Sequence, residues 1–328
     1  MKKVVVLLII VALLAALIAG AALMSKKEAE APIENAGTAQ NAAVKTKSLT
    51  YNGQEYPMKT HLQTVLLIGT DAVEAYEQTT EGVKPFYNYN QADFLTLLVL
   101  DTDNNTAEIL QVNRDTMTDV PWLDVLGNYG GTEFKQLCLA FNYGDGGPKS
   151  CRNTVSAVSS LLFDAPIDYY MQVPMTAIPV LNDVVGGVPI TFQEDMTDID
   201  PAFVKGATVR LDGSQAEKFV RSRMGLSDDT NTYRMERQLQ YLDSFQNCAR
   251  EAIDTDSQFV LTLLEKLSDY LQTNLTGDQL VNFITQLDES EISPIRPPQG
   301  TLTLEDGHYA FYVDLDPTWE DVKRAYCG

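Results

Sequence analysis

The feature that most constrains this chain is an unbroken apolar run near its N-terminus. The run extends from Val4 to Met24, directly after Lys2 and Lys3, and contains no charged residue. About 20 apolar residues suffice for one helix to cross a bilayer, and flanking lysines favour the cytoplasmic side. We therefore expect residues 1–3 to be a cytoplasmic tail and residues 4–24 to be the transmembrane anchor of a single-pass cell-membrane protein, with the remainder extracytoplasmic.

A cleaved signal peptide is the alternative interpretation of this segment. The small residues Ala19, Gly20 and Ala21 would suit a signal peptidase. The apolar run is, however, longer than the apolar region of about 7–15 residues that is usual in a signal peptide. The sequence therefore favours a retained anchor.

The composition changes after the apolar run. Residues 25–60 are rich in Ala, Asn, Lys and Glu without an apolar period, which is typical of a flexible linker. Residues 61–250 carry strong strand and helix patterns and are predicted to form the main domain. Residues 251–328 are predicted to be an extension of helices and a strand that packs on this domain, and the sequence assigns them no chemistry.

Strand and helix patterns alternate along the main domain. Apolar, β-branched runs predict buried strands at 64–70, 94–101 and 107–113, and Asp103-Asn104-Asn105 predicts a hairpin turn between the last two. Further strands are predicted at 168–173 and 188–192. Helical spacing is found at 133–144, 153–162, 175–185, 212–223, 231–250, 259–271 and 278–287. This order predicts an α/β fold, a three-layer α/β/α arrangement with a mixed central sheet.

The chain is acidic, yet it concentrates arginines in one window. Its formal net charge is -21, which opposes nucleic-acid binding. Such a window therefore indicates a confined anionic ligand, because the planar guanidinium holds two oxygens of one phosphate or carboxylate. The alternative is a solvated helix whose arginines pair with Asp228, Asp229 and Glu236. The arginines of the window are Arg221, Arg223, Arg234 and Arg237.

Two aspartates lie where predicted strands begin or end. Asp71 follows the strand at 64–70, and Asp93 precedes the strand at 94–101. Two convergent carboxylates suit Mg²⁺, which keeps several waters and bridges phosphate oxygens. The alternative is that Asp71 caps the next segment and Asp93 is a turn residue.

Arg114 emerges from the end of the strand at 107–113. It could form a structural ion pair with Asp115. Combined with the aspartates and the arginine window, it matches what phosphoryl transfer requires, since that catalysis is mostly positioning and electrostatic stabilisation.

Histidine and cysteine usage narrows the chemistry further. Only His61 and His308 occur, which argues against His-based triads and His-ligated zinc. The chain has four cysteines, and disulfides can form on the extracytoplasmic side of the membrane. Cys138 with Cys151 is the favoured pair because a turn-rich segment separates them, and Cys248 with Cys327 would follow by elimination. Free buried thiols are the alternative.

Short motifs in a fixed order resemble the LytR-CpsA-Psr family of cell-wall polymer ligases. A short anchor with an extracytoplasmic domain is also that family's usual layout. The motifs lie between Thr64 and Gln246 and are LLIGTDA, QADFLTLLVLD, ILQVNRDTMTDV, LAFNYGDGG, IDYYMQV, LNDVVGGVPITF, LDGSQAEKFVRSR and YRMERQ.

The resemblance implies an α/β/α fold with a hydrophobic pocket for a polyprenyl tail. It also implies transfer of a phospho-glycopolymer, such as a teichoic acid or a capsule, from undecaprenyl pyrophosphate to peptidoglycan. The acceptor is commonly the 6-hydroxyl of N-acetylmuramic acid. The expected partners are therefore a polyprenyl-pyrophosphate-linked glycan, peptidoglycan and the membrane, without nucleic acid.

Roles for individual residues are carried over by position. The resemblance assigns Mg²⁺ to Asp71 and Asp93, and catalytic roles to Asp93, Arg114, Arg221 and Arg223. It assigns pyrophosphate contacts to Arg114, Arg221, Arg223, Arg234, Arg237 and Gln238.

One position departs from the family pattern. Gln91 stands where the family usually has an arginine, two residues before the second metal aspartate. It is counted among the expected pyrophosphate contacts, but a neutral amide supplies no charge-assisted bidentate contact, and losing one costs about 1.5–3 kcal/mol. Two alternatives to the Mg²⁺-dependent phosphotransferase therefore stay open: a non-catalytic binder or regulator of lipid-linked glycans, and a polyprenyl-pyrophosphate hydrolase.

Overall fold

The computed structural model describes residues 47–71, 88, 90–124, 126–222, 231–256, 259, 262, 266–267, 269–305 and 307–328. The predicted anchor at 4–24 lies outside these residues. Among the residues described, no helix has the length and apolar character needed to cross a membrane.

The chain divides into two compact units. The first, which we call the sheet unit, contains the described residues up to Val173 together with Gln272–Leu275 and Thr285–Gly328. The second, the helical unit, contains Pro174–Leu271 and Thr276–Ile284.

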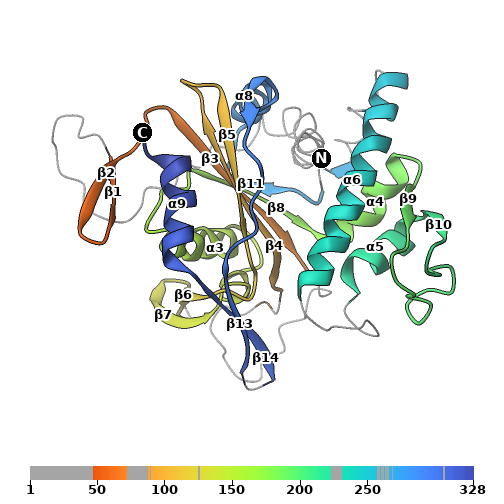
Figure 1. Cartoon of the computed structure of the whole chain (residues 1–328), viewed down its shortest axis with the longest axis horizontal. Helices are drawn as coiled ribbons and strands as arrows, with labels where there is room; N and C mark the ends of the chain where they lie inside the picture. The colour runs from red at the N-terminus through yellow and green to blue at the C-terminus, as the bar shows by residue number, and fades with distance from the viewer. Residues whose placement is uncertain are drawn as a thin grey trace. The chain divides into compact units, whose positions relative to one another are not determined.

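A mixed sheet forms the centre of the sheet unit (Figure 1). Strand β3 pairs antiparallel with β4, β4 pairs antiparallel with β5, and β12 pairs parallel with β5. The strands predicted from the apolar runs and the hairpin between β4 and β5 are thereby confirmed. In sheet order the strands are β11 (Gln272–Thr273), β8 (Tyr169–Pro174), β3 (Leu62–Thr70), β4 (Ala92–Asp101), β5 (Thr106–Val112) and β12 (Glu291–Ile292).

One face of this sheet forms the main hydrophobic core. Leu66, Leu97 and Leu110 lie opposite one another across β3, β4 and β5, because side chains of paired residues share a face. Helices α3 (Pro148–Leu161) and α9 (Leu315–Tyr326) contribute buried apolar residues to the same core. The C-terminal helix is therefore part of the core of the sheet unit.

The N-terminal hairpin packs against this C-terminal helix. Strands β1 (Ser48–Tyr51) and β2 (Gln54–Pro57) pair with each other, and the ring of Tyr51 stacks on Trp319 at 4.9 Å. Residues 48–57 were expected to belong to the flexible linker, and that expectation is wrong for them. Their aromatic side chains are ordered by α9, which lies too far along the sequence for a local pattern to indicate it.

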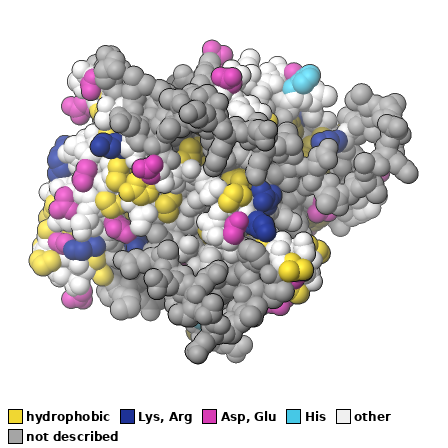
Figure 2. Space-filling model, turned by 180° about the vertical axis from the view of Figure 1, so that it is seen from behind, with side chains coloured by type: hydrophobic (Ala, Val, Ile, Leu, Met, Phe, Trp, Pro, Cys, Tyr) yellow, Lys and Arg dark blue, Asp and Glu magenta, His cyan; other side chains and the backbone are white. Residues whose placement is uncertain are grey.

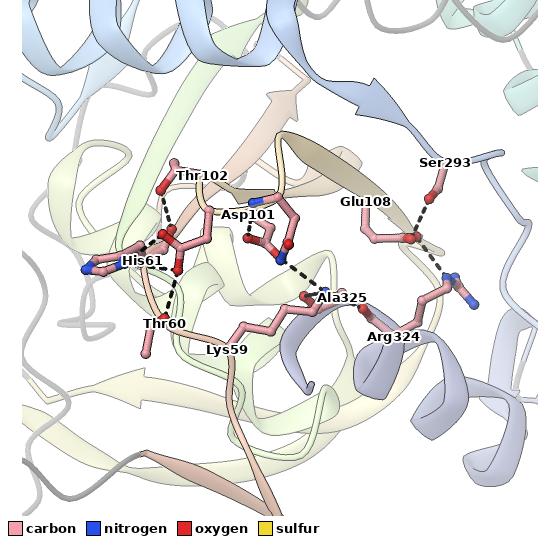
Figure 3. Close-up of polar contacts among 11 residues, drawn as sticks. Lys59, Thr60, His61, Asp101, Thr102, Glu108, Ser293, Arg324 and Ala325 are labelled. Carbon is pink, nitrogen blue, oxygen red and sulfur yellow. Dashed lines mark hydrogen bonds and ion pairs between the residues drawn. The ribbon is translucent and has the colours of Figure 1, made fainter.

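Polar contacts reinforce the attachment of α9 (Figure 3). Arg324 donates to Glu108 at 3.0 Å, and Ser293 donates to the other carboxylate oxygen of Glu108 at 2.5 Å. Lys59 donates to the carbonyl oxygen of Arg324 at 2.8 Å and lies 3.6 Å from Asp101. Buried carboxylates on β4 and β5 are thus paired with cations.

Two further hairpins belong to the sheet unit: β6 (Met117–Leu123) with β7 (Tyr129–Gln136), and β13 (Gly300–Glu305) with β14 (His308–Val313). The helix predicted over 133–144 is wrong in its first half, because residues up to Gln136 continue β7. Only α2 (Leu139–Asn142) is helical there. Pairing with β6 overrides the local helical spacing.

The helical unit has its own small core. Phe192 stacks on Phe203 with ring centroids 4.6 Å apart and meets Phe219 edge to face at 5.6 Å. Asp212 begins α5 with a capping box that Gln215 completes. The unit's elements are η2 (Met175–Ala177), α4 (Ile178–Val184), β9 (Val188–Thr191), β10 (Thr208–Leu211), α5 (Gly213–Arg221) and α6 (Asn231–Thr255), and α8 (Gly277–Glu289) begins in it.

Candidate functional site

A β-bulge presents Asp93 at the start of β4. Gly69 pairs with Phe94 and Thr70 pairs with Ala92, so Asp93 has no partner in the β3 register. Gly69 permits this close pairing, since a Cβ there would lie 2.9 Å from the Cβ of Phe94. Bulges re-aim side chains and are common beside active sites.

Asp93 is paired with Arg114, and both side chains are 6% exposed. Nε of Arg114 donates to Asp115 at 3.1 Å. Nη2 donates to Oε1 of Gln91 at 2.6 Å and to Sγ of Cys138 at 3.1 Å. The structural ion pair of Arg114 with Asp115, which the sequence analysis left as an alternative, is present, and Arg114 also pairs with Asp93.

These contacts occupy most of the guanidinium. Arg114 has five N–H donors, and its partners among the described side chains engage Nε, Nη1 and both hydrogens of Nη2. One Nη1 hydrogen remains in this arrangement. Arg114 can thus contribute its positive charge to an anion, while a bidentate contact requires an acceptor such as Gln91 to be displaced.

Asp71 and Gln91 are joined across β3 and β4. The backbone N–H of Gln91 donates to Oδ1 of Asp71, and the backbone N–H of Asp71 donates to the carbonyl oxygen of Gln91 at 3.1 Å. Asp71 is half-buried. The structure therefore brings Asp71, Gln91, Asp93 and Arg114 into one hydrogen-bonded group, which we call the strand-end cluster.

The strand-end cluster fits Mg²⁺ only in combination with a substrate. Its metal candidates are two carboxylates, and no group of three or more His, Cys, Asp or Glu side chains suited to a metal occurs among the residues described. Mg²⁺ is commonly bound through one or two carboxylates, with water and substrate phosphates supplying the other oxygens. Asp71 and Asp93 match that pattern and do not match a preformed all-protein cage.

The expected disulfides are not formed: the four cysteines are free thiols in the structure. Cys138 precedes α2 and accepts from Arg114, whereas Cys151 lies on α3 in the apolar core. Burial raises the pKa of the Cys151 thiol well above its ordinary range. The pairs Cys138–Cys151 and Cys248–Cys327 are therefore corrected to free thiols.

In the helical unit, Arg221 ends α5 and Arg237 is buried on α6. Arg221 is exposed and pairs with Glu217 one turn earlier at 2.8 Å. An exposed, paired arginine fits the alternative of a solvated helix, but Glu217 is not one of the acidic partners suggested from the sequence. Arg237 donates through Nη2 to the carbonyl oxygen of Ser222. Burial lowers the pKa of Arg237, and the charge of Glu194 opposes that shift.

The structure gives no side-chain contacts for the other predicted pyrophosphate-binding residues, Arg223, Arg234 and Gln238. Arg223 falls outside the described residues. Arg234 and Gln238 belong to helix α6, and their side chains are outside the description. Their roles stay predictions.

Two contacts, one in each unit, were not predicted from the sequence. Cys138 contacts Arg114, although the sequence placed it in a disulfide. Glu194 acts on Arg237 from a loop that carried no motif for chemistry. Neither contact has a local sequence pattern, because each joins a residue outside the helices and strands to a residue far from it in the sequence.

Charges on the described surface are mixed. Figure 2 shows Asp and Glu side chains interspersed with Lys and Arg over one face, without a continuous basic field among the residues drawn in colour. The electrostatic candidates for an anion are therefore individual arginines.

Comparison with known proteins now identifies the family. A relative from Bacillus cereus (strain AH820), named polyisoprenyl-teichoic acid–peptidoglycan teichoic acid transferase TagU, is 28% identical over 229 residues, 68% of each chain. The crystal structure of B. subtilis TagT shares the fold with a TM-score of 0.55 at 20% identity, covering 87% of this chain and 98% of TagT. A structure of TagT bound to LIIa-WTA gives 0.55 at 21% identity, covering 80% and 89%.

The model of the LytR_cpsA_psr family matches residues 24–321, which include the strand-end cluster and also Arg221 and Arg237 of the helical unit. The resemblance seen in the motif order is thereby confirmed, and this chain belongs to the LytR_cpsA_psr family.

Proposed function

We propose that this protein is a membrane-anchored, extracytoplasmic phosphotransferase that moves a phospho-glycopolymer from a polyprenyl pyrophosphate carrier to peptidoglycan. Its relatives are named as teichoic acid transferases, and membership of the family supports a role in attaching cell-wall polymers. The apolar run Val4–Met24 is proposed as the anchor.

The strand-end cluster is the observation that carries this proposal. A bulge places Asp93 beside a buried Arg114, and Asp71 joins them through Gln91. Diphosphate chemistry needs groups of both signs at fixed positions: carboxylates to hold a divalent cation and a guanidinium to attract phosphate oxygens. The cluster supplies both.

The proposed reaction forms one bond to phosphorus and breaks one. The acceptor hydroxyl oxygen gives up its proton to the surrounding water and forms a bond to the phosphorus that carries the glycan. The bond from that phosphorus to the bridging oxygen breaks, and polyprenyl monophosphate leaves. Arg114 would stabilise negative charge on the diphosphate, and Arg221, Arg223, Arg234, Arg237 and Gln238 are proposed as further pyrophosphate contacts.

Asp71 and Asp93 would hold Mg²⁺ in this proposal. When bound there, the cation would supply charge neutralisation for the diphosphate. Asp71 suits that role because it is half-buried and only one of its carboxylate oxygens is engaged among the described residues.

Gln91 has a role that does not require a family arginine. Its amide oxygen accepts from Arg114, whereas an arginine at this position would place a second donor-only cation against the first. We propose that Gln91 orients Arg114, so that one guanidinium provides the positive charge near Asp93. The transferase is therefore favoured over a degenerate, non-catalytic binder.

The test uses the full chain purified in detergent, with a lipid-linked glycopolymer, Mg²⁺ and peptidoglycan. Wild type and Asp71→Asn are compared for polymer attached to peptidoglycan. Asn keeps an oxygen that can accept from the backbone of Gln91, so the fold is expected to persist while the charge is lost. We expect transfer by wild type and a loss of at least about 100-fold in the variant, the scale of about 2.7 kcal/mol.

The matched control is Asp119→Asn, which removes one exposed carboxylate from β6 of the same unit. It should transfer at the wild-type rate. Wild-type protein that is folded and transfers no polymer, or an Asp71→Asn variant as active as wild type, would refute the assignment.

A further inference from the structure

Cys138 joins the start of β4 to the backbone of Arg114. The carbonyl oxygen of Cys138 accepts from the backbone N–H of Ala92 at 3.1 Å, directly before Asp93. The backbone N–H of Cys138 donates to the carbonyl oxygen of Arg114 at 2.9 Å. Cys138 therefore fixes the backbone beside Asp93 and at Arg114, the two members of the buried ion pair.

The thiol of Cys138 also contacts the head group of Arg114. Its Sγ accepts from Nη2 at 3.1 Å, and Nη2 donates its other hydrogen to Oε1 of Gln91 at 2.6 Å. Cys138 is 0% exposed, so bulk water does not compete for this contact. Arginine has several rotatable bonds, so acceptors for separate hydrogens are needed to hold its planar head in one direction.

The acceptors around Arg114 differ in charge from one end of the guanidinium to the other. Nε and Nη1 face the carboxylates of Asp115 and Asp93, which balance part of the positive charge. Nη2 meets a neutral amide and a thiol among the described residues. A neutral acceptor orients a donor without cancelling its charge, so the Nη2 end keeps a positive potential for a diphosphate.

Burial alone does not account for the position of this thiol. Cys151 is also 0% exposed, and it lies among the apolar residues of the main core. Cys138 is not a member of that core in the described part of the chain, and its sulfur contacts a guanidinium instead. The hydrogen bond from Arg114 is therefore the feature that distinguishes these two buried thiols.

We propose that Cys138 is a positioning residue for phosphotransfer. Its Sγ holds Nη2 of Arg114, so that the guanidinium is aimed before the diphosphate binds. A charge that is already aimed needs no reorganisation during the reaction. The inference rests on the proposed function and deepens it, because it names the residue through which the β6–β7 hairpin, ending at Gln136, controls the direction of Arg114.

The first experiment measures polymer transfer to peptidoglycan by the full chain in detergent, with lipid-linked glycopolymer and Mg²⁺. Cys138→Ala and Cys151→Ala each remove one fully buried thiol from the sheet unit, so they are matched in size and burial. We expect Cys138→Ala to lower kcat about tenfold, which corresponds to about 1.4 kcal/mol, and Cys151→Ala to keep the wild-type kcat.

The KM for the lipid-linked glycopolymer distinguishes orientation from binding. It should stay within about twofold of wild type in Cys138→Ala, because Arg114 keeps its charge and only the geometry needed in the transition state is lost. An equal loss of kcat in Cys151→Ala would overturn the inference, since the loss would then report only a buried cavity. A raised KM with unchanged kcat would also overturn it.

Cys138→Ser provides the rescue. Serine keeps an acceptor at this position, so it should return kcat to within about threefold of wild type. A kcat as low as that of Cys138→Ala would contradict the role of the sulfur as an acceptor. Circular dichroism of each variant, compared with wild type, verifies that the rates refer to folded protein.

NMR of the arginine side chains tests the contact independently of activity. In the full chain labelled with ¹⁵N-arginine, Arg114→Lys identifies the Arg114 signals by their loss. Rotation about the Cζ–Nη2 bond should be at least about tenfold faster in Cys138→Ala than in wild type, because one of two bonded hydrogens is released. Cys151→Ala should rotate as wild type does, and equal rates in all three proteins would overturn the inference.

Failure of this inference and failure of the proposed function give different results. Folded wild type that transfers no polymer would refute the phosphotransferase, and the NMR rates would still decide whether the thiol orients Arg114. Transfer by wild type together with unimpaired transfer by Cys138→Ala would refute the positioning role and leave the phosphotransferase standing.

Discussion

Replacing Asp93 with alanine should destabilise the sheet unit by about 3 kcal/mol. Removing one partner of a buried ion pair costs about 3–5 kcal/mol, because the other charge is left buried without compensation. Both side chains of the Asp93–Arg114 pair are 6% exposed. Arg114 retains Asp115 at 3.1 Å and Gln91 at 2.6 Å, which places the expected loss at the lower end of that range.

Tryptophan fluorescence measures this loss without interference from the helical unit. The chain has two tryptophans, Trp122 and Trp319, and both lie in the sheet unit. With a urea slope of about 2 kcal/mol/M, the unfolding midpoint should fall by about 1.5 M. Asp119→Ala, an exposed aspartate of β6, is the control and should leave the midpoint unchanged within about 0.3 M.

A fall of less than about 0.5 M for Asp93→Ala would refute the reasoning, since it would mean that the pair contributes little to stability. The result also bears on activity measurements. If the expected loss is found, inactivity of Asp93→Ala does not distinguish a catalytic role from unfolding, and Asp71→Asn becomes the variant that tests the chemistry.

Three further outcomes are expected. Iodoacetamide should label at most Cys248 in the native chain, because the other three thiols are buried. It should label all four cysteines after unfolding without reductant, and labelling of only two would indicate a disulfide. Trp319→Ala should cost about 3–5 kcal/mol because this ring is 2% exposed in the main core, and a urea midpoint equal to wild type, measured by circular dichroism, would contradict the placement of α9. The hydrogen bond from Lys218 lowers the pKa of Asp200 below its ordinary 3.8, so this carboxylate stabilises the fold above that pH and the stabilisation is lost as the pH falls through its folded pKa. The melting-temperature difference between wild type and Asp200→Asn should therefore be present near neutral pH and should disappear as the pH falls below 3.8. A difference independent of pH would exclude this linkage.

Local patterns predicted the strands that carry the strand-end cluster. The runs at β3, β4 and β5 are long, apolar and β-branched, and these properties are set by the residues themselves. The bulge at Asp93 could not be predicted in the same way. It depends on the register between Gly69 and Phe94, which pairing across two strands determines.

The errors share a dependence on distant contacts. Residues 48–57 have linker-like composition, yet Tyr51 is ordered by α9 and donates to Asp316, 265 positions away. The stretch 133–136 has helical spacing but pairs with β6. Cys138 and Cys151 are close in sequence, and the turn between them directs one thiol to Arg114 and the other into the core.

The role of Gln91 also required the structure. As a sequence difference it indicated a lost phosphate contact. The hydrogen bond from Arg114 at 2.6 Å adds that the amide oxygen is an acceptor for the neighbouring guanidinium. This second interpretation depends on the side-chain geometry, which the sequence does not give.

The lipid product of the wild-type protein provides the most direct test of the proposed phosphotransfer. Full chain, lipid-linked glycopolymer and Mg²⁺ are incubated with and without peptidoglycan, and the products are identified by mass spectrometry. The proposal predicts polyprenyl monophosphate in equal amount to polymer attached to peptidoglycan, and little of either product without the acceptor. Free phospho-glycan released at the same rate without peptidoglycan would contradict transfer and establish a hydrolase, and intact lipid-linked polymer under both conditions would contradict catalysis.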